Sequence, residues 1–111
     1  MMTGILTVFV TTANEDEALR IANGLVAERL AACANIVATV RSIYRWKGEI
    51  HDSEERLMII KTRSELFPAL EKRIRELHSY EVPEIVACPI AVGNADYLQW
   101  VFDCTREGAT A

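Results

Sequence analysis

The order in which two apolar periodicities follow one another limits this chain to few folds. Strand-like, β-branched character marks four segments, which are residues 5–11, 33–46, 55–62 and 85–92. Apolar residues at spacings of three and four, typical of amphipathic helices, mark residues 15–30, with Leu19 and Val26 on the apolar face, and residues 64–77. Asn14, with Glu17 at the third helical position, predicts the start of the first helix. A last helix is expected after Asn94. The predicted order is strand, helix, strand, strand, helix, strand, with an extra C-terminal helix.

This order predicts an α+β fold with a ferredoxin-like βαββαβ topology. Because strand–helix–strand crossovers are right-handed, both main helices should cover one face of an antiparallel sheet. Pro89 lies within the fourth strand segment and has no backbone N–H, so that strand is predicted at an edge of the sheet. The ferredoxin-like order places its fourth strand there. At 111 residues the chain is predicted to be a single domain, 1–111.

The sheet face without helices is expected to be too apolar to stay in water. Because side chains alternate along a strand, that face carries either the set of side chains named next or the neighbours that point the opposite way. The set is Tyr44, Trp46, Met58 and Ile60. An uncovered apolar face in so small a domain predicts self-association.

Composition argues against several classes of partner. A net charge of −4 argues against nucleic acid, which needs a strong cationic field. The sequence has no apolar run of about 18 residues, so no membrane span is expected. Cys33, Cys88 and Cys104 are scattered and odd in number, which is typical of reduced thiols. With no secretory signal at the N-terminus, a cytoplasmic protein is expected.

Motifs of three specialised uses of this topology are missing. A copper chaperone would carry paired cysteines after the first strand, where this chain has Thr11–Ala13. An acylphosphatase would have a Gly-rich anion loop there, but Glu15 and Asp16 would repel an anion. An RNA-recognition domain would show aromatic and basic sheet residues. Because no nucleophile–base motif, HExxH or P-loop is present either, no enzymatic activity is predicted.

The densest group of potential ligands falls in residues 78–84. Its members are His78, Tyr80, Glu81 and Glu84. Imidazole and carboxylates suit a borderline divalent ion such as copper or zinc. The alternative interpretation is a rigid loop, stiffened by Pro83, in which Glu84 forms an internal ion pair with Lys61 or Arg63.

Six short segments, in order along nearly the whole chain, carry the most specific signal. They are Val10–Ala13, Leu30–Ile36, Ser42–Gly48, Ile60–Thr62, His78–Ile85 and Asp96–Trp100. With these segments the chain resembles the CutA divalent-cation-tolerance family. The resemblance implies a ferredoxin-like subunit in a homotrimer, similar in architecture to PII-type signalling proteins. It also implies a cytosolic role in tolerance to divalent metals, copper binding in some members, no obligatory cofactor and no enzymatic reaction.

The copper site of the family carries over only in part. Some bacterial members bind copper through a cysteine at the end of the first strand and adjacent histidines before a Pro-Tyr pair. In this chain Thr11 stands at the position of the cysteine, Leu77-His78 replaces the histidine pair, and Ser79 replaces the proline. The resemblance therefore leaves His78 and Glu84 as the candidate ligands of copper or zinc.

The resemblance also implies a ligand pocket near the clefts between subunits. The matching positions are Trp46, Lys61, Tyr80 and Glu84. Lys61 would suit an anion and the aromatic rings would stack on a ligand. The alternative is that these residues fix the trimer interface. Two functions stay open: a trimeric metal-tolerance protein that binds copper or another divalent cation, and a PII-like module that binds a small ligand or a partner protein in its clefts.

Overall fold

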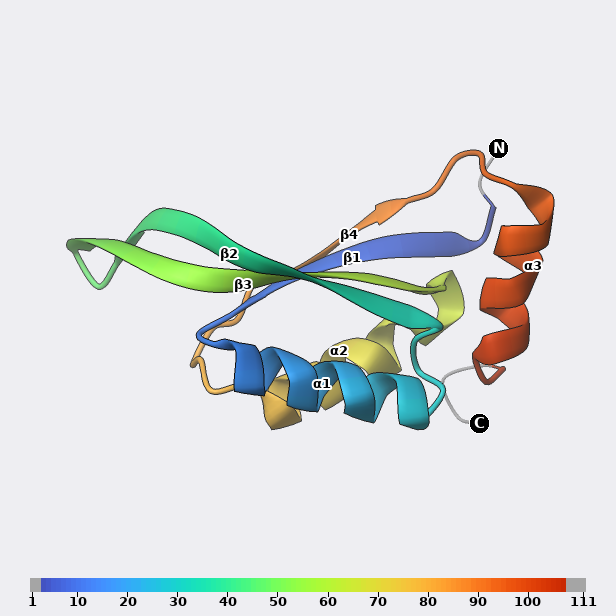
Figure 1. Cartoon of the computed structure of the whole chain (residues 1–111), viewed down its shortest axis with the longest axis horizontal. Helices are drawn as coiled ribbons and strands as arrows, with labels where there is room; N and C mark the ends of the chain where they lie inside the picture. Colours follow the sequence, from blue (N-terminus) through green and yellow to red (C-terminus); the bar gives the residue numbers. More distant parts are fainter. Residues whose placement is uncertain (1–2, 108–111) are drawn as a thin grey trace.

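The computed structural model describes residues 3–107, in which a four-stranded antiparallel sheet carries two helices on one face (Figure 1). The elements are β1 (Ile5–Thr12), α1 (Glu15–Ala27), β2 (Cys33–Trp46), β3 (Glu49–Arg63), a 3₁₀ turn (Ser64–Leu66), α2 (Phe67–Leu77), β4 (Ile85–Pro89) and α3 (Ala95–Cys104). The predicted α+β class and order of elements are confirmed. The ends of the predicted domain, 1–2 and 108–111, lie outside the described residues. Within the described part, every helix is too short or too polar to cross a membrane.

The sheet order β2-β3-β1-β4 places β4 at an edge, as Pro89 requires. Pro89 stands opposite Leu6 in the register and is the last residue of β4. The predicted strand to residue 92 is therefore too long, since the pairing of β4 with β1 ends at Pro89. Beyond it, the backbone N–H of Ile90 still donates to the carbonyl of Ile5 at 2.9 Å, which holds the chain beside β1.

The hydrophobic core lies between the sheet and the two helices α1 and α2. Its fully buried side chains include Val8, Val10, Met58 and Ile60 from the sheet, and Ile21, Leu25, Leu70 and Ile74 from the helices. Two residues of the predicted apolar face of α1 are not buried: Leu19 and Val26 are 44% and 42% exposed. The helix also ends before residue 30, because Arg29 adopts φ 61 and the N–H of Leu30 turns back to the carbonyl of Leu25.

A long hairpin extends β2 and β3 beyond the rest of the sheet (Figure 1). Its turn uses Lys47 and Gly48, with φ values of 51 and 82. Positive φ at both central residues matches the right-handed twist of the strands, which is why two-residue hairpins favour it. Because the turn is this tight, β3 begins at Glu49 rather than near residue 55.

One extra residue in β2 interrupts the hairpin ladder. Val37 pairs with Leu57 and Val40 with Glu55, so two residues of β2 stand opposite one residue of β3. Such a β-bulge reverses the alternation of side chains along the bulged strand relative to its partner.

The bulge decides which residues reach the helix-free face of the sheet. Ile36, before the bulge, pairs with Met58 on the helix side. Tyr44 and Trp46, after the bulge, pair with odd-numbered residues of β3 and lie on the helix-free face. The prediction that Tyr44 and Trp46 share a face with Met58 and Ile60 is wrong, because it assumed unbroken alternation.

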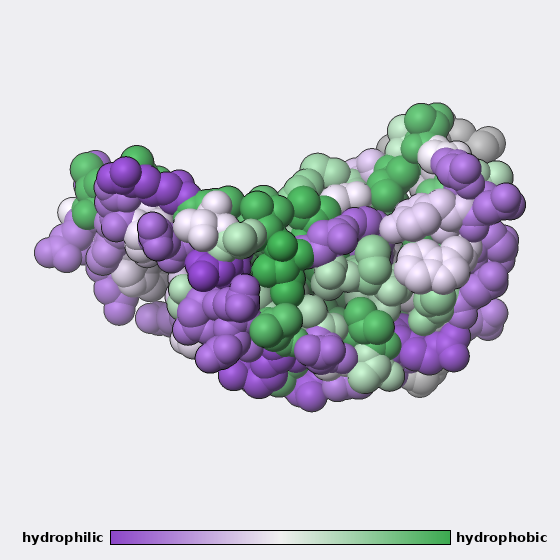
Figure 2. Space-filling model, in the orientation of Figure 1, coloured by the Kyte–Doolittle hydropathy of each residue, from purple (hydrophilic) through white to green (hydrophobic). Residues whose placement is uncertain are grey.

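The helix-free face retains apolar side chains in contact with solvent. Phe9 pairs with Ile59 on one side and Val86 on the other, and Val86 is 51% exposed. Figure 2 shows apolar side chains around the hollow between the long hairpin and α3. α3 itself packs at the far end of the sheet, where Val101 is buried against Ile5 and Ala32.

We expect Leu70→Ala to lower the free energy of unfolding by about 2–5 kcal/mol, because it leaves a cavity under α2. Leu19→Ala removes the same atoms from a helical side chain that is 44% exposed, so it should cost about 0.5 kcal/mol or less. Denaturant titration at one fixed protein concentration measures both. Equal losses for the two variants would contradict this placement of the core.

Candidate functional site

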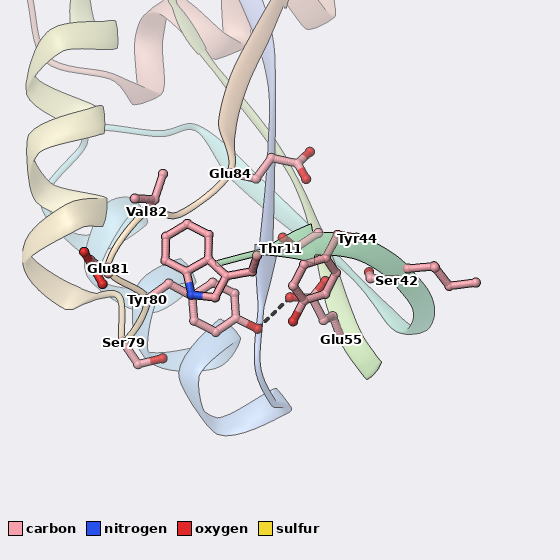
Figure 3. A pocket seen from close by; sticks show the side chains of 11 residues that line it. Thr11, Ser42, Tyr44, Glu55, Ser79, Tyr80, Glu81, Val82 and Glu84 are labelled. Carbon is pink, nitrogen blue, oxygen red and sulfur yellow. Dashed lines mark hydrogen bonds between the residues drawn. The ribbon is translucent and has the colours of Figure 1, made fainter. Parts of the chain in front are cut away.

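A cavity of about 620 Å³ opens where the hairpin meets the loop that precedes β4 (Figure 3). β2 contributes Tyr44 and Trp46 to its wall, β3 contributes Glu55, and the loop contributes Tyr80 and Glu84. Figure 3 shows the Tyr80 hydroxyl directed at Glu55, with Glu84 entering from the start of β4. The volume lies within the range of small-molecule sites, about 300–1,000 Å³.

His78 lies behind this cavity rather than in its wall. Its side chain is fully buried, and its Nε2 lies 2.7 Å from the backbone carbonyl of Thr11. Its Nδ1 accepts the backbone N–H of Tyr80 at 3.1 Å. A carbonyl can only accept and a backbone N–H can only donate, so the pair of partners selects the neutral tautomer with the proton on Nε2. Both ring nitrogens are therefore already used, and His78 fixes the loop to β1.

Glu17 anchors the same loop from the first turn of α1. The Asn14 side chain caps the helix by accepting the N–H of Glu17 at 2.9 Å, as the sequence predicts. The Glu17 carboxylate then accepts the N–H of Ala13 at 3.3 Å and that of Ser79 at 2.9 Å. Sequence reasoning assigned Glu17 only to the cap, since nothing local shows that the loop 62 residues away would reach it.

The pKa of Glu17 reflects this anchoring role. Burial alone would raise the pKa of its carboxyl. Hydrogen bonds from Ser79 and Ala13 outweigh burial and hold the pKa below its ordinary value. The anchor is therefore strongest when Glu17 is ionised.

Glu55 and Tyr80 form the floor of the cavity. The Tyr80 hydroxyl donates to the Glu55 carboxylate at 2.6 Å, and Glu55 is only 4% exposed. Burial and the adjacent carboxylate raise the pKa of Tyr80 well above its ordinary value, so its hydroxyl keeps its proton. Sequence reasoning missed Glu55, because a single acid at the start of an apolar strand carries no motif.

The predicted ligand-pocket residues come together with one exception. Trp46, Tyr80 and Glu84 all line the cavity, whereas Lys61 does not. The Lys61 ammonium donates instead to the side-chain oxygen of Asn35, across the β2–β3 ladder. The wall therefore has no lysine for an anion.

The predicted metal pair, His78 and Glu84, is divided between two environments. Glu84 lines the cavity, and His78 is enclosed behind it. Over residues 3–107, no three side chains of the His, Cys, Asp or Glu type converge as ligands of one metal ion. The alternative ion pair is not formed there either, because Lys61 bonds to Asn35 and Arg63 pairs with Glu65 at 2.9 Å.

Comparison with known proteins gives matches over nearly the whole chain. Residues 6–104 match the family described as CutA1 divalent ion tolerance protein. The divalent-cation tolerance protein CutA of Thermus thermophilus is 51% identical over 98 residues, which cover 88% of this chain and 95% of that protein. Human protein CutA is 50% identical over 98 residues, 88% of this chain but only 55% of its own length. The crystal structure of CutA1 from Oryza sativa has a TM-score of 0.92 at 41% identity, covering 96% of this chain and 98% of that one.

We predict that Glu17 makes stability depend on acidic pH. A carboxyl whose pKa is lowered on folding contributes stability that is complete above its unfolded value, about 4.5, and is lost as the pH falls through the folded value. In Glu17→Gln this part of the pH dependence should disappear. Unfolding free energies measured by denaturant titration between neutral and acid pH check the prediction.

Asp16→Asn is the matched control for that experiment, because Asp16 is an exposed carboxylate in the same helical turn. Asp16→Asn should keep the pH dependence of the unfolding free energy that the unmodified protein has. If the unfolding free energy of Glu17→Gln kept the same pH dependence, this would show that Glu17 does not anchor the loop.

Proposed function

The chain belongs to the CutA1 divalent ion tolerance family, and on this basis we propose that it is a homotrimer of ferredoxin-like subunits that acts in divalent-cation tolerance by binding cations. The observation that supports cation binding is the cavity beside the hairpin. Its wall contains three carboxylates, those of Glu55, Glu81 and Glu84, and no lysine, arginine or histidine. Such a wall lowers the energy of any cation that enters it.

The trimer proposal draws on the helix-free face of the sheet. One subunit leaves Val86 half exposed there, next to Phe9 and Ile59. Burying this face against copies of the chain would remove apolar surface from water, which stabilises by about 25 cal/mol per Å². A closed trimer, which the family resemblance implies, would cover this face in every subunit.

For the divalent ion, we assign the binding role to Glu84 rather than to His78. Copper or zinc would have to displace Thr11 or Tyr80 from the imidazole, and leaving such a buried group unsatisfied costs about 1–3 kcal/mol. A hydrated ion held by the charge of the cavity carboxylates needs no such change. Because few protein ligands contact it directly, this binding is weak.

A non-catalytic role agrees with the chemistry of the wall. Tyr80 is the hydroxyl in direct contact with a carboxylate, and its raised pKa makes it a poor nucleophile. Neither lysine nor histidine is among the lining residues to serve as a general base at neutral pH. Binding is therefore the function that these side chains support.

We expect light scattering to find trimers of the unmodified protein and smaller species of Val86→Lys. The lysines would be buried together without partners, which costs several kcal/mol per charge. Leu19→Lys is the control, because Leu19 is 44% exposed on α1 and Val86 is 51% exposed on the sheet. A monomeric unmodified protein at micromolar concentration would overturn the trimer proposal.

Calorimetric titration of Cu²⁺ into chelator-treated protein tests the metal assignment. Removing one carboxylate near the ion should cost about 1 kcal/mol, so Glu84→Gln should weaken binding about fivefold. His78→Gln keeps a donor for Thr11 and should weaken binding less than Glu84→Gln does. Loss of binding in His78→Gln, with Glu84→Gln unaffected, would instead make the imidazole the ligand.

A further inference from the structure

A buried carboxylate without a positive partner lies at the centre of the cavity. Glu55 is 4% exposed, and its one hydrogen bond in the described structure comes from the Tyr80 hydroxyl at 2.6 Å. No arginine, lysine or histidine within residues 3–107 forms an ion pair with it. Buried charges are normally paired, because an unpaired one loses its hydration without compensation. The missing positive charge is a property that a ligand can supply.

Aromatic rings surround this carboxylate. Tyr44, Trp46 and Tyr80 all line the same cavity. The Tyr44 ring stacks on His51, with centroids 5.3 Å apart and planes 11° apart, so its orientation is supported from behind. Aromatic faces attract cations, and more strongly when the contact is desolvated. Rings and carboxylates together favour a cation that also has an apolar part.

The chain holds an ammonium group of its own at the edge of the cavity. Lys47 Nζ lies 5.6 Å from the centroid of the Trp46 ring and 3.5 Å from the Glu81 carboxylate. Both Trp46 and Glu81 line the cavity, and the Lys47 side chain is 69% exposed. The side chain of Lys47 therefore shows which ligand chemistry these two residues accept, and its exposure leaves it free to move aside.

Size and donor geometry distinguish an organic cation from a bare metal ion. A cavity of about 620 Å³ is large for one ion and suits a molecule of several heavy atoms. Its carboxylates come from different segments, since Glu55 is on β3 and Glu84 precedes β4. Within the described part, no three of the His, Cys, Asp and Glu side chains converge on one point, as a tight metal site needs.

We propose that the cavity binds a small organic amine in its ammonium form, with the charged group between Glu55 and the ring faces of Tyr44 and Trp46, and the alkyl part along the same rings. This inference rests on the proposed function in one respect, that the cavity is a cation site. It replaces the anionic ligand that Lys61 led us to expect, because Lys61 lies outside the wall. It also gives Glu55 a role distinct from that of Glu84, to which the metal ion was assigned.

Three probes of equal chain length separate charge from shape: butylammonium, butan-1-ol and butyrate. Isothermal titration into the assembled full-length protein should give saturable binding of butylammonium, with butan-1-ol about tenfold weaker and butyrate without binding. Tenfold corresponds to about 1.4 kcal/mol, within the range of a partly desolvated cation–π contact. Equal affinity for the amine and the alcohol, or preferential binding of butyrate, would overturn the proposal.

Two variants test the residues. Glu55→Gln keeps an acceptor for the Tyr80 hydroxyl and should bring the butylammonium affinity down to that of butan-1-ol. Glu54→Gln is its control, because it removes the same charge from an exposed neighbour outside the cavity wall. Lys47→Met removes the competing ammonium and should tighten butylammonium binding, whereas Lys72→Met on α2 should not. An equal loss in Glu55→Gln and Glu54→Gln would reduce the effect to net charge and overturn the proposal.

The copper titration separates this inference from the proposed function. If butylammonium does not bind while Cu²⁺ binds in a way that depends on Glu84, only the organic-amine inference is overturned. Failure of both cations in a folded trimer would overturn the assignment of the cavity as a cation site. Because Glu55 is buried, thermal unfolding of Glu55→Gln should accompany the titration. Should that variant fail to fold, Trp46→Leu, at a position 37% exposed, should weaken butylammonium more than butan-1-ol.

Discussion

The extra residue in β2 is the constraint on which the rest of the molecule depends. Before the bulge, apolar side chains of β2 and β3 meet the helices and close the core. After it, Tyr44 and Trp46 turn to the opposite face, where the loop before β4 meets them. Without the extra residue both rings would point to the helix side, beyond the reach of that loop. One backbone irregularity thus separates the residues that pack in the core from those that line the cavity along a single hairpin.

The cavity wall is rigid on one side because buried polar groups hold the loop. His78 connects it to β1 through Thr11, and Glu17 connects it to the start of α1 through Ser79. Every group in this network has a partner of the complementary kind, which is the condition under which a buried polar network stabilises. His78, which first suggested a metal site, therefore acts on the cavity indirectly, by positioning Tyr80.

Local chemistry in the sequence was enough for most of the fold. Pro89 required an edge strand and Asn14 required a helix start, and both requirements depend on neighbouring atoms alone. The bulge near Val37 and the burial of His78 depend on contacts between distant segments, so no local pattern revealed them. The candidate site divides in the same way. The family resemblance supplied Trp46, Tyr80 and Glu84, while Glu55 becomes notable only once Tyr80 covers it.

The edge strand β4 has a consequence for solution behaviour. An exposed sheet edge invites further strands, and repeated addition leads to fibrils. β4 offers only four residues before Pro89, which has no backbone N–H to donate, and the chain continues from there to α3. The closed trimer proposed above requires that association through the apolar sheet face is not accompanied by growth at the sheet edges. The proline acts as a gatekeeper against amyloid-like extension at this edge, so that self-association can be closed rather than open-ended.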